Sequence, residues 1–145
     1  MLSACSLLGP GSVRVDAPAV TGDAARACTA LVDALPDHVD DQDRRKVEGA
    51  GHAAAWGDPA IELRCGVRRP AALDPFATCQ VVNGVGWFIP DEQQTGRPHS
   101  ITMTTVGRAA YVEVRLPRRY WPPAAAMADL AHAVRSTVPD VKPCL

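Results

Sequence analysis

The residues whose types could most readily take part in binding or catalysis lie in the segment AAWGDPAIELRCGV, residues 54–67. It contains the sequence Trp-Gly-Asp-Pro and, shortly after it, Cys65. An indole beside a carboxylate, here Trp56 and Asp58, can stack on and hydrogen-bond a sugar or another ring, so both are candidate binding residues. Gly, Asp and Pro are also turn-forming residues. The alternative is therefore a structural corner, with Trp56 covering the core.

Cys65 is a candidate nucleophile or one half of a disulfide. Around it, apolar and charged residues alternate over residues 61–68, which is typical of a half-buried strand. The thiol lies on the apolar face of this pattern, and the segment contains no histidine. Because a thiol buried in apolar surroundings is inert, we predict a disulfide and no catalytic role for Cys65.

The other polar residues form no catalytic motif. The four histidines are scattered and match no zinc motif: His38, His52, His99 and His132. No serine lies in a G-x-S-x-G or S-x-x-K sequence, and the chain has no phosphate-binding glycine loop. We therefore assign no catalytic residue, no metal and no cofactor. An enzyme without a known motif, or a small-ligand binder acting on cell-wall material through the region of Trp56 and Asp58, stays the alternative.

The most charged run is PDHVDDQDRR, residues 36–45. Its aspartates offer oxygen ligands to a hard cation, but the central Gly and terminal Glu of an EF-hand loop are missing. We predict a solvated loop whose acids offset Arg44, Arg45 and Lys46.

Composition limits the partners. The chain has 145 residues and a net charge of −1, with 47% hydrophobic residues. This length favours one globular domain, and the charge argues against a nucleic-acid partner.

The N-terminus carries the pattern Leu2-Ser3-Ala4-Cys5, which is typical of a bacterial lipobox. We expect Cys5 to be lipidated and to anchor the chain to a membrane. The basic and apolar regions that normally precede a lipobox are missing, so we expect the chain to be truncated at its start. The segment that follows is rich in Gly, Pro and Ser, so residues 1–20 are interpreted as a flexible tether and 21–145 as the domain.

Of five cysteines, the four after Cys5 suit two disulfides in an exported protein, although three pairings are possible. Residues 22–35 show helical periodicity with Cys28 on the apolar stripe, and Pro36 ends the helix. Since Cys28 and Cys65 both face the core, we favour Cys28–Cys65, and Cys79–Cys144 follows by elimination. The third option is a cytosolic protein with free thiols, should the lipobox be accidental.

Two hairpins and a second helix complete the expected fold. Asn83-Gly84 predicts a tight turn within residues 79–89. Gly107-Arg108 predicts a two-residue turn within residues 101–116, which places Met103 opposite Val112. The predicted apolar face of this hairpin consists of Ile101, Met103, Ala110, Val112, Val114 and Leu116. Pro122 and Pro123 open a second helix, which Pro139 ends. Its apolar stripe consists of Met127, Leu130, Ala131, Val134 and Val138. We expect a two-layer α+β domain with about five mostly antiparallel strands and two helices on one face.

The surface stretch LPRRYWPP, residues 116–123, contains residue types that are enriched at binding hot spots. We take four of them as a candidate binding surface: Arg118, Arg119, Tyr120 and Trp121. The alternative is that the two aromatic side chains pack at the entry of the second helix and the arginines are solvated.

Four blocks, in this order, resemble the actinobacterial envelope family known as domain of unknown function 3515: CTALVDALPD (28–37), AAWGDPAIELRCGV (54–67), NGVGWF (83–88) and VGRAAYVEVRLP (106–117). The resemblance covers nearly everything after about residue 22. It implies a secreted or lipid-anchored protein of a high-GC Gram-positive bacterium and brings no activity with it. We expect a non-enzymatic, extracytoplasmic lipoprotein that binds an envelope protein or a cell-wall component.

Overall fold

The structure is a computed structural model that describes residues 11–142. In this range the helices are α1 (Gly22–Ala34) and α2 (Ala124–Thr137), with short 3-10 helices η1 (Asp91–Gln93) and η2 (Arg118–Tyr120). The strands are β1 (Val13–Arg14), β2 (His38–Val39), β3 (Gln42–Arg45), β4 (Val47–Glu48), β5 (His52–Trp56), β6 (Ile61–Val67), β7 (Gln80–Val82), β8 (Val85–Phe88), β9 (Ile101–Thr105) and β10 (Tyr111–Leu116).

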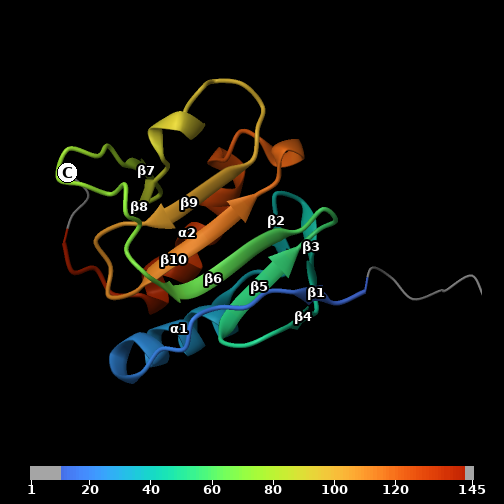
Figure 1. The fold of residues 1–145 in the computed structure, drawn as a ribbon. Coiled ribbons are helices and arrows are strands. Elements are labelled where there is room, and N and C mark those ends of the chain that lie inside the picture. Colours follow the sequence, from blue (N-terminus) through green and yellow to red (C-terminus); the bar gives the residue numbers. More distant parts are fainter. Residues whose placement is uncertain (1–10, 143–145) are drawn as a thin grey trace, which may run out of the picture.

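One large antiparallel sheet dominates the described range. Its eight strands follow the order β2-β3-β5-β6-β10-β9-β8-β7, while β1 and β4 form a separate parallel pair. Both helices lie on one face of the large sheet and contact each other (Figure 1). The predicted two-layer α+β architecture is therefore confirmed. The expected number of about five strands is too low.

Two of the strands that were not expected lie in the acidic run, which was predicted to be a solvated loop. Its residues form the hairpin β2–β3, in which Val39 pairs with Gln42 and is fully buried. Asp40 and Asp41 make the turn with φ values of 50° and 60°. Two successive positive φ values define the two-residue turn that best fits a hairpin, and Asp tolerates them better than most residues.

The core lies between the sheet and the two helices. Cys28 and Leu31 of α1 are fully buried, and α2 buries its predicted stripe: Met127, Leu130, Ala131, Val134 and, just after the helix, Val138. The buried face of β6 holds Ile61, Leu63 and Cys65, as the alternating pattern predicts.

The Cys28–Cys65 disulfide is present and joins α1 to the central strand β6. Both residues have no exposed surface. Cys79 is also disulfide-bonded. Cys144 and Cys5 lie outside the described residues, so the Cys79–Cys144 pairing and the lipidation of Cys5 stay predictions.

The two predicted hairpins have different outcomes. Asn83 and Gly84 form the turn between β7 and β8, as predicted, with φ values of 49° and 84°. In the second hairpin the apolar face is confirmed, but Met103 pairs with Val114 and not with Val112. The two-residue turn is wrong because residues 106–110 make a longer connection. Gly107 O there accepts hydrogen bonds from the amides of Val141 and Lys142.

The described part of the predicted tether belongs to the domain. Val15 and Ala17 are buried, and their amides donate to Glu48 O and Ala50 O. The boundary predicted at residue 20 is therefore wrong, because residues 13–17 lie along residues 46–50. Within residues 11–142, no helix is both long enough and apolar enough to cross a membrane.

Candidate functional site

The fold brings together the two stretches from which the candidate binding residues were drawn. Tyr120, in η2, donates a hydrogen bond of 2.7 Å from its hydroxyl to Pro59 O, in the turn between β5 and β6. Gly57 of the same turn has φ +77°, and a Cβ added there would lie 2.8 Å from the Tyr120 hydroxyl. The turn and η2 are thus packed too closely for any residue but glycine at position 57.

A hollow of about 430 Å³ lies beside this junction. It is lined by Gln42, Asp43, Arg44, Arg45, Lys46, Gly57 and Asp58. Arg45 donates to Gly57 O over 2.9 Å and lies 4.0 Å from the Asp58 carboxylate. Its buried Nε has no hydrogen-bond partner among the described residues.

Arg44 is held differently. It donates to Val32 O over 3.1 Å and to Leu35 O over 3.2 Å, at the C-terminal end of α1. These carbonyls lack partners within a helix, and a cation there also complements the helix dipole. No basic residue occupies the last turn of α1 itself, so Arg44 supplies from β3 what the helix lacks.

Burial perturbs two titratable groups near the junction. It raises the pKa of Tyr120, and the surrounding charges of Arg119, Asp58, Asp40 and Arg45 add smaller effects of both signs. Burial also raises the pKa of Asp40, with further contributions from the negative charges of Asp41 and Asp129. A phenol near neutral pH stays protonated, so Tyr120 remains a hydrogen-bond donor.

Trp56 cannot stack on a ligand. Its side chain is fully buried, and Nε1 donates to Pro36 O over 3.0 Å. The prediction that Trp56 belongs to a binding surface is therefore wrong, and the corner interpretation is the right one. Asp58 is exposed at the turn.

The stretch of arginine and aromatic residues, 118–121, likewise contains both buried and exposed side chains. Arg118 and Arg119 are exposed, but Tyr120 is buried, and the Arg119 guanidinium lies 5.7 Å from its ring centre. Tyr120 is thus a packing residue and not a surface one. Trp121 is half-buried and lines a separate hollow of about 270 Å³ with Ile89 and Ile101.

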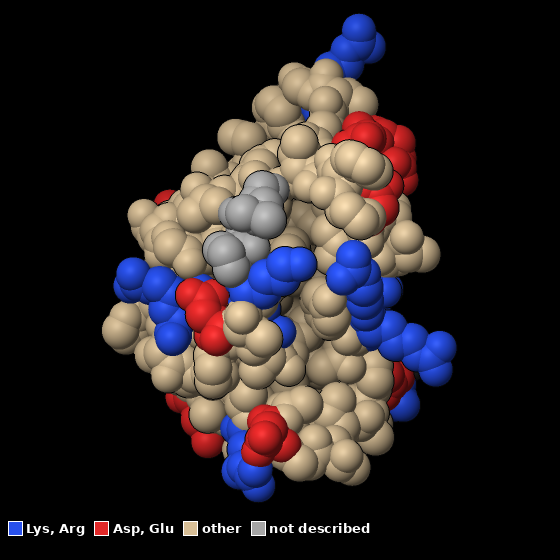
Figure 2. All heavy atoms as spheres, turned by 90° about the vertical axis from the view of Figure 1, so that its left-hand side faces the viewer, with Lys and Arg blue, Asp and Glu red and all other residues tan. Residues whose placement is uncertain are grey.

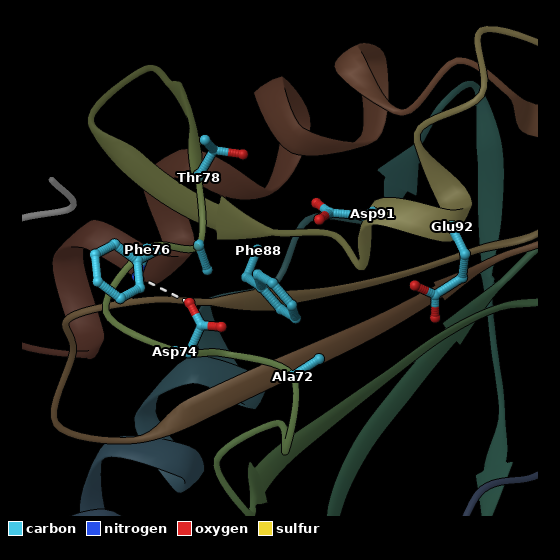
Figure 3. Close-up of a pocket in the computed structure, with 8 residues that line it drawn as sticks. Ala72, Asp74, Phe76, Thr78, Phe88, Asp91 and Glu92 are labelled. Carbon is cyan, nitrogen blue, oxygen red and sulfur yellow. Dashed lines mark hydrogen bonds between the residues drawn. The ribbon is translucent and has the colours of Figure 1, made fainter.

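Another pocket was missed by the sequence analysis. It has a volume of about 250 Å³ and lies between the connection from β6 to β7 and η1. Figure 3 shows Phe88 in its middle, with Asp74 on one side and Asp91 and Glu92 on the other. Phe76 lies at one end and is 92% exposed. A bulky apolar residue beside Pro in an otherwise turn-like segment, Asp74-Pro75-Phe76, is the signal that was available.

The two arginines at the junction are engaged within the fold. Among residues 11–142, no three His, Cys, Asp or Glu side chains lie close enough to hold a metal ion. In the hollow at the junction, Arg44 and Arg45 are occupied by main-chain carbonyls. The other charged side chains on the wall of this hollow are Asp43, Lys46 and Asp58.

Comparison with known proteins gives one result. A family model described as "Protein of unknown function (DUF3515)" matches residues 10–143. Searches of curated proteins and of solved structures give no match.

Proposed function

We propose that this chain, which belongs to the family of proteins of unknown function DUF3515, is a non-enzymatic binding module of the bacterial cell envelope. It works outside the cytoplasmic membrane of an actinobacterium. A lipid on Cys5 anchors it to the outer face of that membrane, unless it is secreted. Its partner is an envelope protein or a cell-wall component.

The observation that carries the location is the Cys28–Cys65 disulfide. Disulfides form and persist in oxidising compartments and are rare in a reducing cytosol. This one joins the first helix to the central strand and is fully buried, so it is part of the core. A third disulfide-bonded cysteine, Cys79, supports the same location.

The position of Gly11 supports membrane anchoring. Arg45 donates a hydrogen bond to Gly11 O, and the exposed Arg14 and Lys46 lie on β1 and next to β4 at the same end. Gly11 is six positions after Cys5, so the two can be at most about 22 Å apart. A lipid on Cys5 therefore keeps these cations near an anionic bilayer, where each contributes about 1 kcal/mol.

The interactions of the charged residues support binding rather than catalysis. Arg44 and Arg45 hold main-chain carbonyls, and Tyr120 holds Pro59. Side chains engaged in this way fix the fold and are not free to act on a substrate. The exposed Arg118, Arg119 and Asp58 remain available for contacts.

A second candidate is a small-ligand binder that takes cell-wall material. The hollow of about 430 Å³, with Lys46, Asp43 and Asp58 on its wall, favours it. Its volume is within the range of ligand pockets. With Trp56 buried, a ligand there is held by charged groups and not by ring stacking.

The test is metabolic labelling with a palmitate analogue in an actinobacterial host that carries the complete gene. The proposal predicts that the wild-type protein is labelled and fractionates with the membrane, and that Cys5→Ser removes the label. A protease added to cell-wall-free cells should degrade the wild-type protein. An unlabelled protein that resists the protease until the cells are lysed contradicts the proposal.

A further inference from the structure

The large exposed apolar side chains lie at one corner of the described molecule. They are Phe76, Val141 and Val81, which are 92%, 72% and 60% exposed. Phe76 and Val81 flank Cys79 in the chain, and Val141 lines a hollow with Pro75 and Ala77. Large apolar side chains gathered at one place on a soluble domain mark an interaction site. We call the surface formed by these three residues and the pocket beside Phe76 the Phe76 corner.

The corner also includes a sheet edge. β7 is the last strand of the large sheet and pairs only with β8 among the described strands. It has three residues, and its Val81 side chain is exposed. An unpaired edge beside apolar side chains is a surface on which a partner segment can lie extended.

The pocket beside Phe76 combines an apolar floor with a negative rim. Ala72, Ala77 and the buried Phe88 supply the floor, and Asp74, Asp91 and Glu92 lie around it (Figure 3). Its volume of about 250 Å³ is below the usual range for a whole small ligand. It is better suited to one long side chain of a larger partner.

The carboxylates of this rim have no ion-pair partner in the part of the chain that the structure describes. No ion pair joins Asp74, Asp91 or Glu92 to another described residue. Asp74 accepts a hydrogen bond of 2.8 Å from the Phe76 amide, a donor that carries no positive charge. Figure 2 shows Asp and Glu side chains grouped at the upper right of this side of the molecule. A Lys or Arg side chain would find carboxylates at its charged end and aromatic rings along its stem.

The position of the corner suits a protein held by its N-terminus. In Figure 1, the connection from β6 to β7 lies on the opposite side of the molecule from β1, where the described chain begins. An anchor on the N-terminal side therefore leaves the Phe76 corner facing away from the membrane.

We infer that the Phe76 corner docks an extended segment of a protein partner in which Lys or Arg side chains alternate with apolar ones. This inference rests on the proposed function, because it names the partner class of that binding module. The apolar side chains of the segment cover Phe76 and Val81, and a cation enters the pocket between Asp74 and Asp91. Charge complementarity and the shape of the pocket select such a segment.

A second copy of this chain is a poorer occupant. Two of its cations on the same side are already engaged, since Arg69 donates to Leu73 O over 2.6 Å and Arg108 to Val138 O over 2.8 Å. A third, the exposed Lys142, lines the same hollow as Asp74. Two copies that meet through this corner would also bring their uncompensated carboxylates together.

The test uses the chain with Cys5→Ser, labelled with ¹⁵N, and two blocked peptides, Lys-Leu-Lys-Leu-Lys and Glu-Leu-Glu-Leu-Glu. We expect the lysine peptide to shift the amide signals of residues 74–82 and 91–92, and the glutamate peptide to leave them unchanged. Asp91→Asn combined with Glu92→Gln should weaken binding at least fivefold. Phe76→Ser should weaken it about tenfold and, as an exposed substitution, leave the fold intact.

The matched control combines Asp33→Asn with Glu48→Gln. These carboxylates are exposed, lie on α1 and β4, and change the net charge by the same amount. Any of four results overturns the inference. They are equal weakening by the control pair, signal shifts spread over the whole surface, no binding, and shifts at the Phe76 corner that depend on protein concentration alone. The last result identifies a second copy as the occupant. Each leaves the palmitate and protease results untouched, so the two proposals fail separately.

Discussion

Tyr120 and Pro59 are joined by a 2.7 Å hydrogen bond across 61 residues of sequence. This bond fixes η2, at the entry of α2, onto the turn that connects β5 to the central strand β6. Two stretches that looked like separate ligand-binding surfaces are one packed junction. Their aromatic side chains hold the fold, and the charged side chains around them remain at the surface.

Removing the hydroxyl of Tyr120 tests how much this hydrogen bond contributes to stability. Tyr120→Phe leaves Pro59 O without its donor, so the free energy of unfolding should fall by about 1–2 kcal/mol. Tyr111→Phe is the control, because the hydroxyl of the half-buried Tyr111 donates no hydrogen bond to another residue in the range 11–142. It should cost under about 0.5 kcal/mol. Urea denaturation of both variants measures the difference. Equal effects would show that the bond adds nothing.

The same phenol predicts a pH effect. The pKa of Tyr120 is raised in the folded state, mainly by burial. The folded state therefore favours the protonated phenol, and its contribution to stability is lost as pH rises above about 10. Between pH 9 and 11 the wild type should lose more stability than Tyr120→Phe. Parallel losses in a urea titration series would contradict this prediction.

Gly57 allows η2 to approach the turn. Gly57→Ala adds a Cβ at 2.8 Å from the Tyr120 hydroxyl and forces alanine to φ +77°. Gly96→Ala is the control, since it has φ +73° and open space around it. We expect about 1 kcal/mol for Gly96→Ala from the backbone alone and clearly more for Gly57→Ala. In a Tyr120→Phe background the excess should shrink, and an unchanged excess would mean that Tyr120 does not cause it.

Asp40 should destabilise the β2–β3 turn when ionised. Its pKa is raised by burial and by Asp41 and Asp129, so the folded state favours the protonated carboxyl. The stability that this gives is present below about pH 4 and is lost as pH rises through the folded pKa. Asp40→Asn should therefore raise stability slightly at pH 7, since the site is largely open to solvent, and by less at pH 3. Asp37→Asn, at an exposed position, is the control. A gain that does not change with pH would come from the backbone preference of Asn at φ 50° alone.

The disulfide closes a loop with a sequence separation of 37 residues. Replacing both cysteines, Cys28→Ala with Cys65→Ala, should lower the free energy of unfolding by about 3–4 kcal/mol on the chain-entropy model. Thermal and urea denaturation without reductant measure the loss. A loss under about 1 kcal/mol would show that the bond is dispensable for the fold and would weaken its use as evidence for an oxidising compartment.

Local patterns predicted the helices and the faces of the central strands. The alternation around Cys65 and the apolar stripe around Leu130 could be read from the sequence because each element buries one face, and the buried positions are apolar. The register of β9 and β10 was missed by two residues because a shift of two leaves every side chain on the same face. The connection at Gly107 is held by contacts with segments distant in sequence, since Gly107 O accepts from Val141 and Lys142 and the Val106 amide donates to Gly86 O.

Function was harder to predict because residue type does not reveal exposure. Trp56 and Tyr120 have the chemistry of ligand-binding residues, yet both are buried. Each donates a long-range hydrogen bond, Trp56 to Pro36 O and Tyr120 to Pro59 O. Phe76 looks like a core residue and is almost fully exposed. The β2–β3 hairpin was hidden because its turn uses Asp40 and Asp41, whose positive φ values are less common than those of Asn-Gly.

The most direct test of the account is the redox state of Cys28 and Cys65 in protein taken from its natural compartment. The protein is denatured without reductant, its thiols are alkylated, and peptides are mapped by mass spectrometry. The account predicts that neither cysteine is alkylated and that a peptide pair joined through Cys28 and Cys65 is found. Free, alkylated thiols at both positions would contradict the extracytoplasmic location and with it the proposed envelope function.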